Sequence, residues 1–146
     1  MTARCVVLVC AAALCSFAQF RTIEMTFKGV GCASCIESLP GRVQRLRGVE
    51  SATVDAGTGV LRVKLAEQNR VRVEQIRDFV EQDGTKAASA VVSATGEIRE
   101  EGGRRVIQIG SSTYVVTNTA LAGVQTIAGE IVDLKPESGA ITIRIR

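Results

Sequence analysis

The sequence contains no histidine and no tryptophan, and its aromatic residues are limited to four phenylalanines and one tyrosine. General-base triads and metal sites built on histidine are therefore excluded. With so few aromatics, a hydrophobic core has to be made from valine, isoleucine, leucine and alanine. Little remains that could do chemistry apart from the five cysteines.

Strong charge and long apolar segments are also missing. The formal net charge of +3 over 146 residues is too small and too evenly spread to indicate nucleic acid or an acidic membrane as partner. After the first 20 residues, no apolar run is long enough to span a bilayer. The length fits one ordinary domain or two very small ones.

The first 18 residues have the pattern of an export signal. Arg4 gives a positive start, Cys5 to Leu14 is apolar, and Ser16-Phe17-Ala18 resembles a small-x-small cleavage site. Cleavage would leave Gln19 as the first mature residue, and a retained N-terminal anchor is the alternative. We therefore expect an exported protein, periplasmic or extracellular, with no stable membrane insertion after cleavage.

Two cysteines remain after this cleavage, Cys32 and Cys35. Two thiols at this spacing can chelate one soft metal ion, or they can close on each other as a disulfide. An oxidising compartment favours disulfides. A bridge here would close only a very short loop, however, and the stabilisation from a crosslink grows with loop length. A functional pair is therefore the preferred interpretation.

Hydrophobic periodicity predicts strand, helix, strand, strand, helix, strand over residues 22–94. Strands are expected at 22–29, 49–55, 60–65 and 87–92. Helices are expected between the cysteines and Gly48, and from about Val73 to Gly84. This order predicts an α+β, ferredoxin-like βαββαβ domain, with a four-stranded antiparallel sheet and both helices on one face. Pro40 falls inside the first helix and predicts a kink or a restart there.

Residues 95–103 are charged and glycine-rich, which is typical of a linker or an open turn. Beyond them the pattern predicts strands only, as one hairpin over 106–117 and another over 131–145. About 50 residues is near the lower limit for an independent core, so this part forms a small barrel or packs on the first domain. The predicted division is a signal peptide at 1–18, the ferredoxin-like domain at 22–94, and a β-rich C-terminal module at 95–146 for spacing or interaction.

Cys32 and Cys35 fall where the first predicted strand gives way to a helix. The first helical N–H groups and the helix dipole favour thiolate anions at this place. Thiolates prefer soft ions, with Cu(I) first and Hg(II), Cd(II) or Zn(II) as alternatives, and two sulfurs suit a linear ion. A structural zinc site needs four ligands, which the mature chain lacks. We therefore expect a shallow, exchangeable metal site.

Residues 22–94 resemble a heavy-metal-associated domain, the module of copper chaperones, copper-pump N-termini and periplasmic mercury-binding proteins. The matching residues are Gly29-Val30-Gly31-Cys32-Ala33-Ser34-Cys35-Ile36-x-x-Leu39, Leu46-x-Gly48-Val49, Val54-Asp55 and Val71-x-Val73-Glu74-x-Ile76-x-x-x-Val80-Glu81-x-x-Gly84. The resemblance implies that Cys32 and Cys35 bind the metal. It also implies handover to a partner's own Cys-x-x-Cys by thiolate exchange, without catalytic turnover.

The chain departs from that family in the metal-binding loop. The family usually has Met-Thr between the glycine and the first cysteine, where this chain has Val30-Gly31. We expect Val30 to fill the buried role of the methionine and Gly31 to loosen the loop. By resemblance to some eukaryotic copper chaperones, Lys86 would soften the negative charge of a bis-thiolate complex.

Other candidate residues have simpler interpretations. We expect Met25 to pack in the sheet rather than to bind copper. Arg42, Arg45 and Arg47 are interpreted as a solvated helix face, with a docking patch for an acidic partner as the alternative. The sheet lacks the paired aromatics of an RNA-binding surface, which excludes that function.

Three functions remain open. The first is an exported protein that sequesters or transfers a soft metal ion through Cys32 and Cys35. The second is a periplasmic thiol-disulfide exchange protein that uses the same pair. The third is an interaction module in which the metal-binding fold is only a scaffold.

Overall fold

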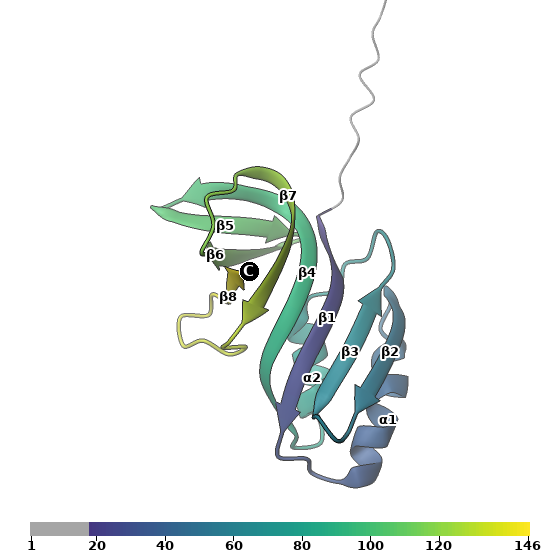
Figure 1. The fold of residues 1–146 in the computed structure, drawn as a ribbon. Coiled ribbons are helices and arrows are strands. Elements are labelled where there is room, and N and C mark those ends of the chain that lie inside the picture. Colours follow the sequence, from purple (N-terminus) through teal and green to yellow (C-terminus); the bar gives the residue numbers. More distant parts are fainter. Residues whose placement is uncertain (1–17) are drawn as a thin grey trace, which may run out of the picture.

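The computed structural model describes residues 18–146 (Figure 1). The predicted signal peptide therefore lies outside the described residues, apart from its last position. Within the described part, no helix is long and apolar enough to cross a membrane. The elements in chain order are β1 (Gln19–Lys28), α1 (Ala33–Gln44), β2 (Val49–Asp55), β3 (Val60–Leu65), α2 (Val73–Glu81), β4 (Lys86–Glu101), β5 (Arg104–Ile109), β6 (Ser112–Thr117), β7 (Gly123–Ile131) and β8 (Thr142–Ile145).

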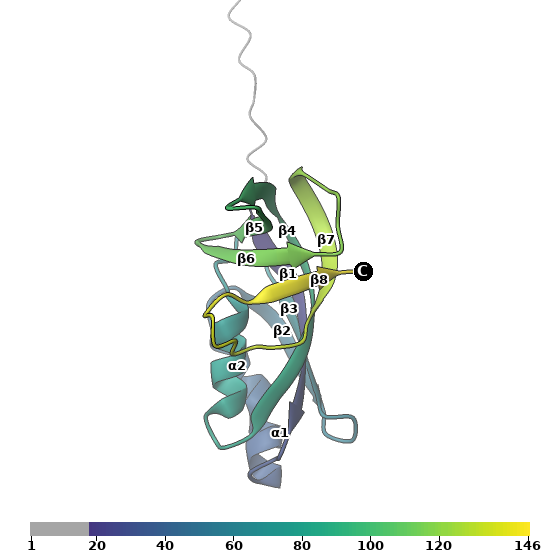
Figure 2. The ribbon, with the colours of Figure 1, turned by 90° about the vertical axis from the view of Figure 1, so that its left-hand side faces the viewer.

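The first six elements form the predicted ferredoxin-like unit. Their strands are ordered β2-β3-β1-β4 and every pair is antiparallel. Both helices lie on one face of this sheet (Figures 1 and 2). Strand β1 shows why one face of the sheet is covered. Ile23, Met25 and Phe27 occupy alternate positions, so their side chains point to the same face, where they are buried. The apolar stripes of the two helices are buried as predicted: Ile36, Leu39, Val43, Val73, Ile76 and Val80.

Helix α1 runs as one element through Pro40, so the predicted restart is wrong. Proline has no N–H to donate to the carbonyl of Ile36, four residues earlier. The side chains of Leu39 and Val43, on either side of this position, are completely buried. Burial of such side chains contributes about 1.5–3 kcal/mol each, which is enough to offset the missing hydrogen bond.

Strand β4 is much longer than expected. The prediction of a linker at residues 95–103 is therefore wrong. Residues 95–101 belong to this 16-residue strand, and only Gly102 and Gly103 form the turn that follows. The charged residues taken for a linker are the outward positions of the strand, since Ile98 is buried between exposed Glu97 and Arg99. The N-terminal part of β4 pairs with β1, and its C-terminal part pairs with β5.

The C-terminal strands close a five-stranded barrel with β4 (Figure 1). The pairing runs β4-β5-β6-β8-β7, and β7 then pairs with β4 to complete the ring. All of these pairs are antiparallel except β6–β8. The predicted hairpin over 106–117 is found as β5 and β6. The second is displaced, because β7 spans Gly123–Ile131 and the first expected strand, 131–134, lies almost entirely outside it. Residues 132–141 form a long connection instead of a tight turn.

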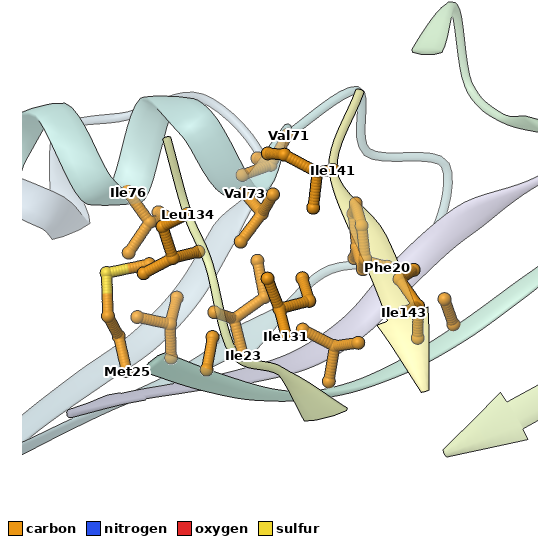
Figure 3. Packing of buried hydrophobic residues seen from close by; sticks show 14 of the residues in the cluster. Phe20, Ile23, Met25, Val71, Val73, Ile76, Ile131, Leu134, Ile141 and Ile143 are labelled. Atoms are coloured by element: carbon orange, nitrogen blue, oxygen red, sulfur yellow. The ribbon is translucent and has the colours of Figure 1, made fainter. Parts of the chain in front are cut away.

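The ferredoxin-like unit and the barrel share one hydrophobic core. Leu134 and Ile141, in the connection between β7 and β8, are buried in the same cluster as Ile76 of α2 (Figure 3). Two polar contacts reinforce this packing. Arg77 Nη1 donates to the Leu134 carbonyl at 2.7 Å, and Tyr114 Oη donates to Glu74 Oε2 at 3.0 Å. Helix α2 is thus held between the sheet and the barrel.

Candidate metal centre

The two cysteines lie on the loop between β1 and α1, as the sequence predicts. Cys32 has extended backbone angles and is the N-cap of α1, while Cys35 lies in the first turn. The Cys35 N–H donates to Cys32 Sγ at 3.1 Å. A sulfur therefore takes the position that a serine or aspartate oxygen takes at most helix N-termini, where the helix dipole favours an anion. Both cysteines are partly exposed.

In this structure Cys32 and Cys35 are joined by a disulfide, with Cα atoms 5.2 Å apart. Reduction would leave two sulfurs on the same turn of backbone. Within residues 18–146, no group of three or more His, Cys, Asp or Glu side chains could hold a metal ion. The donor set thus fits an ion that accepts two sulfur ligands, and it does not fit a closed tetrahedral site.

The loop between β1 and α1, which holds Cys32, packs against the segment that follows α2. Gly29 has a φ of +63°, a conformation that favours glycine. Gly31 is needed for a different reason, since a Cβ atom there would collide with the carbonyl oxygen of Asp83. The Gly31 N–H also lies 3.5 Å from the Oγ1 of buried Thr85. The expectation that Gly31 loosens the loop is therefore wrong, because its lack of a side chain permits close packing.

Val30 does not take the buried place expected for it. Its side chain is 48% exposed, whereas its neighbour in β1, Phe27, is 4% exposed. The nearest buried apolar residues along the chain are Phe27 of β1 and Ile36 of α1, and Val30 lies on the surface between them. An exposed valine beside the two cysteines gives this end of the molecule a small apolar contact point.

Arg42 is not part of a solvated helix face, which corrects the sequence interpretation. Its side chain is only 24% exposed and donates to three acceptors. Arg42 Nη2 lies 2.8 Å from Asp83 Oδ2 and 3.2 Å from the Cys35 carbonyl, and Nη1 lies 3.2 Å from Gln82 Oε1. Arg45 and Arg47 are exposed, as expected. The guanidinium therefore connects α1 to the segment that packs on Gly31.

Asp83 is held as an anion by these contacts. Burial raises the pKa of its carboxyl, but hydrogen bonds from the hydroxyl and the N–H of Thr85, together with Arg42, outweigh it and the net pKa is lowered. The pair Arg42–Asp83 was missed from the sequence. The sequence did hold a sign that Arg42 lies near the cysteines. It follows Cys35 by seven residues, which places both residues on the same side of the helix two turns apart.

The role of Lys86 beside a bis-thiolate complex stays a prediction, and Lys86 is the first residue of β4. Its side chain is exposed, and the residue pairs across the sheet with Lys28, at the end of β1 next to the loop that holds Cys32. The cation that contacts the cysteine segment directly is Arg42, through the Cys35 carbonyl. The two lysines make the sheet end of this loop electropositive.

The fold and the cysteine loop together define a domain of the heavy-metal-associated type. A family profile for the heavy-metal-associated domain matches residues 25–86, which include β1 from Met25, both helices and both cysteines. The chain belongs to this family.

Two curated relatives cover the same region. An uncharacterized protein of Haemophilus influenzae is 34% identical over 67 residues, which are 46% of this chain and 96% of that protein. The copper chaperone CopZ of Staphylococcus haemolyticus is 35% identical over 57 residues, which are 39% of this chain and 82% of CopZ. Among solved structures, a copper-binding domain from HMA7, a P-type ATPase, is 28% identical with a TM-score of 0.41 and covers 46% of this chain and 89% of its own.

Proposed function

We propose that this protein is exported and binds one soft metal ion, with Cu(I) preferred, through the thiolates of Cys32 and Cys35. It would hold the ion or pass it on and would not act as an enzyme. The observation that carries the proposal is a pair of sulfurs at the N-terminus of α1, in residues that offer no third metal ligand. Cu(I) accepts two thiolates, whereas Zn(II) needs further ligands. Hg(II) and Cd(II) are the other soft candidates.

Handover to a partner fits the exposure of the loop. Cys32 and Cys35 are partly exposed, and Val30 beside them is 48% exposed. A thiolate from a partner's own Cys-x-x-Cys could therefore reach a bound ion and replace one sulfur at a time. The similarity to a copper chaperone supports this route, since that protein is named for carrying copper.

Loading requires reduced cysteines. The disulfide takes up two electrons and two protons to give two thiols, and an incoming metal cation then displaces those protons. In an oxidising compartment this reduction needs a thiol reductant. The disulfide is also the observation that favours the second candidate function, thiol-disulfide exchange by the same pair.

A Cu(I) competition titration tests the proposal. Residues 18–146 are kept reduced and titrated against a chromogenic Cu(I) chelator, beside Cys32→Ser, Cys35→Ser and the matched control Ser51→Ala on the exposed edge strand β2. We expect one Cu(I) per chain in the parent and the control, and loss in both cysteine variants. Absence of Cu(I), Hg(II) and Cd(II) binding, combined with rapid reduction of insulin disulfides, would instead establish the exchange function.

Export is tested separately. The full chain is produced in a bacterial host, and the periplasmic fraction is analysed by intact-mass spectrometry. We expect a mass that begins at Gln19. A full-length chain that stays with the membrane fraction would show that residues 1–18 are retained as an anchor.

A further inference from the structure

A cavity of about 770 Å³ lies between the turn that follows α1 and the segment that joins β3 to α2. Contacts between Gly48 and this segment hold the two walls together. The Ala66 N–H donates to the Gly48 carbonyl at 2.9 Å, and a Cβ atom on Gly48 would lie 2.8 Å from the Cβ of Asn69. The volume falls within the range of about 300–1,000 Å³ that is typical of small-molecule sites.

The wall formed by the segment before α2 is fixed by Asn69, whose side chain is only 8% exposed. Its Nδ2 donates to the carbonyls of Phe20 at 2.8 Å and Ala66 at 2.7 Å, and its Oδ1 accepts from the Val71 N–H at 3.1 Å. These bonds hold the neighbouring Gln68 at a φ of +59°, a conformation that is uncommon for a residue with a side chain. The cavity is therefore formed without a ligand.

Two arginines line the cavity, one from each wall. Arg47 belongs to the turn after α1, and Arg70 belongs to the segment before α2. Both are exposed, and within residues 18–146 neither guanidinium takes part in a hydrogen bond or an ion pair. Glu67 is the acidic residue of the lining, so two positive charges face one negative charge.

The remaining lining is mostly polar as well. Gln75 accepts from the Arg72 N–H through Oε1 at 2.9 Å, which leaves its amide NH₂ group as a donor. Leu46 contributes the large apolar side chain of the lining. A guanidinium presents parallel N–H donors that match a carboxylate or a phosphate. Donors of this kind on both walls suit a polar ligand with negative charge at two places.

We propose that this cavity binds a small molecule with at least two oxyanion groups, phosphate or carboxylate, one held by Arg47 and the other by Arg70. The site is separate from the cysteine pair. Cys32 precedes α1 and Arg47 follows it, and a helix of 12 residues is about 18 Å long. The β1–α1 loop and the β3–α2 segment lie at opposite ends of the ferredoxin-like unit (Figure 1). The proposal does not depend on metal binding.

The test is a titration of residues 18–146 with pyrophosphate and, separately, with citrate. Isothermal calorimetry gives the affinity, and amide NMR shifts of the parent locate the site. The variants are Arg47→Gln, Arg70→Gln and Glu67→Gln. Arg62→Gln is the matched control, because it removes the same charge from an exposed position of β3 outside the cavity. Circular dichroism checks the fold of each variant.

We expect saturable binding, and the anion that binds more tightly identifies the ligand as a phosphate or a carboxylate. Each cavity arginine variant should weaken binding at least about tenfold, because a charge-assisted contact is lost. Glu67→Gln should tighten binding, because it removes the negative charge from the lining. Arg62→Gln should leave it unchanged. The NMR shifts should fall on residues 46–48 and 66–70 and leave Cys32 and Cys35 unaffected.

A Kd weaker than about 1 mM for both anions would overturn the proposal. An equal loss in Arg62→Gln would also overturn it, since binding would then reflect charge spread over the surface. Vesicles of phosphatidylglycerol and phosphatidylcholine form a separate arm. Vesicle binding that is lost in Arg47→Gln, without binding of either free anion, would assign the arginines to a membrane surface and overturn the small-molecule site. The NMR shifts of the parent give an answer even if a variant does not fold.

Discussion

Tyr114 of the barrel packs edge-on against Phe20 of β1, with ring centroids 5.5 Å apart and ring planes inclined by 75°. Both side chains are almost completely buried. Burial, with the neighbouring Glu74 carboxylate, raises the pKa of Tyr114, so its hydroxyl stays protonated and donates to Glu74. Two buried aromatic rings thus join the ferredoxin-like unit to the barrel.

Substitutions of Phe20 and Tyr114 should both destabilise the fold, by amounts that differ with what each one removes. Phe20→Ala removes a buried aromatic side chain and should lower the free energy of unfolding by about 3–5 kcal/mol. Tyr114→Phe keeps the ring and loses one hydrogen bond, so about 1 kcal/mol is expected. Urea unfolding followed by circular dichroism measures both. The exposed control Val124→Ala should change stability by less than about 0.5 kcal/mol.

Removing the C-terminal strands should prevent the first unit from folding cooperatively. A chain of residues 18–94 would uncover Val71, Val73 and Ile76, which the barrel connection buries (Figure 3). We expect a broad thermal transition and strong binding of a hydrophobic dye. A dispersed amide spectrum and a sharp unfolding transition would show instead that 22–94 is an independent domain.

Restoring the threonine typical of the family at position 31 should destabilise this particular chain. Its Cβ would meet the Asp83 carbonyl oxygen, which is backbone and cannot move aside easily. Overpacking of this kind costs about 1–3 kcal/mol. Thermal unfolding of Gly31→Thr measures the loss, and amide hydrogen exchange near Asp83 should rise. Gly41→Ala is the matched control, since its site is open and helical, and it should stabilise by about 0.5–1 kcal/mol.

Acid should weaken the ion pair between Arg42 and Asp83, next to the loop that holds Cys32. The folded-state pKa of Asp83 is lowered, so its stabilising contribution is present above the unfolded pKa and is lost as pH falls through the folded value. The unfolded pKa is about 3.9, which places this loss below about pH 4. Urea unfolding between pH 7 and pH 2.5 should show a smaller decrease for Asp83→Asn than for the parent. Identical slopes would show that this carboxylate makes no net contribution.

Local pattern was sufficient to predict the ferredoxin-like unit. Each of these elements buries one face, which produces alternation in β1 and an apolar stripe on each helix. Both patterns can be recognised within a short segment of sequence. The β5–β6 hairpin was predictable for the same reason, because its turn and both strands are adjacent in the sequence. The place of Cys32 and Cys35 at a strand-to-helix junction came from the same local pattern.

The features that sequence reasoning missed depend on contacts between distant segments. Residues 95–101 look polar because one side of β4 faces water, and Gly96 is required where a Cβ would come within 2.8 Å of Ile107. Arg42 looked like a surface charge until the segment after α2 supplied Asp83 as its partner. Closure of the barrel through β4–β7 pairing has no local signature at all.

Strand β4 runs from Lys86, near the loop that holds Cys32, to Glu101 in the barrel (Figure 1). At about 3.3 Å per residue, its 16 residues trace a path of roughly 50 Å. Between Ala90 and Ile98 the strand is paired on both edges, with β7 on one side and with β1 and then β5 on the other. The cysteine loop and the Gly102-Gly103 turn of the barrel thus lie at opposite ends of one continuous strand.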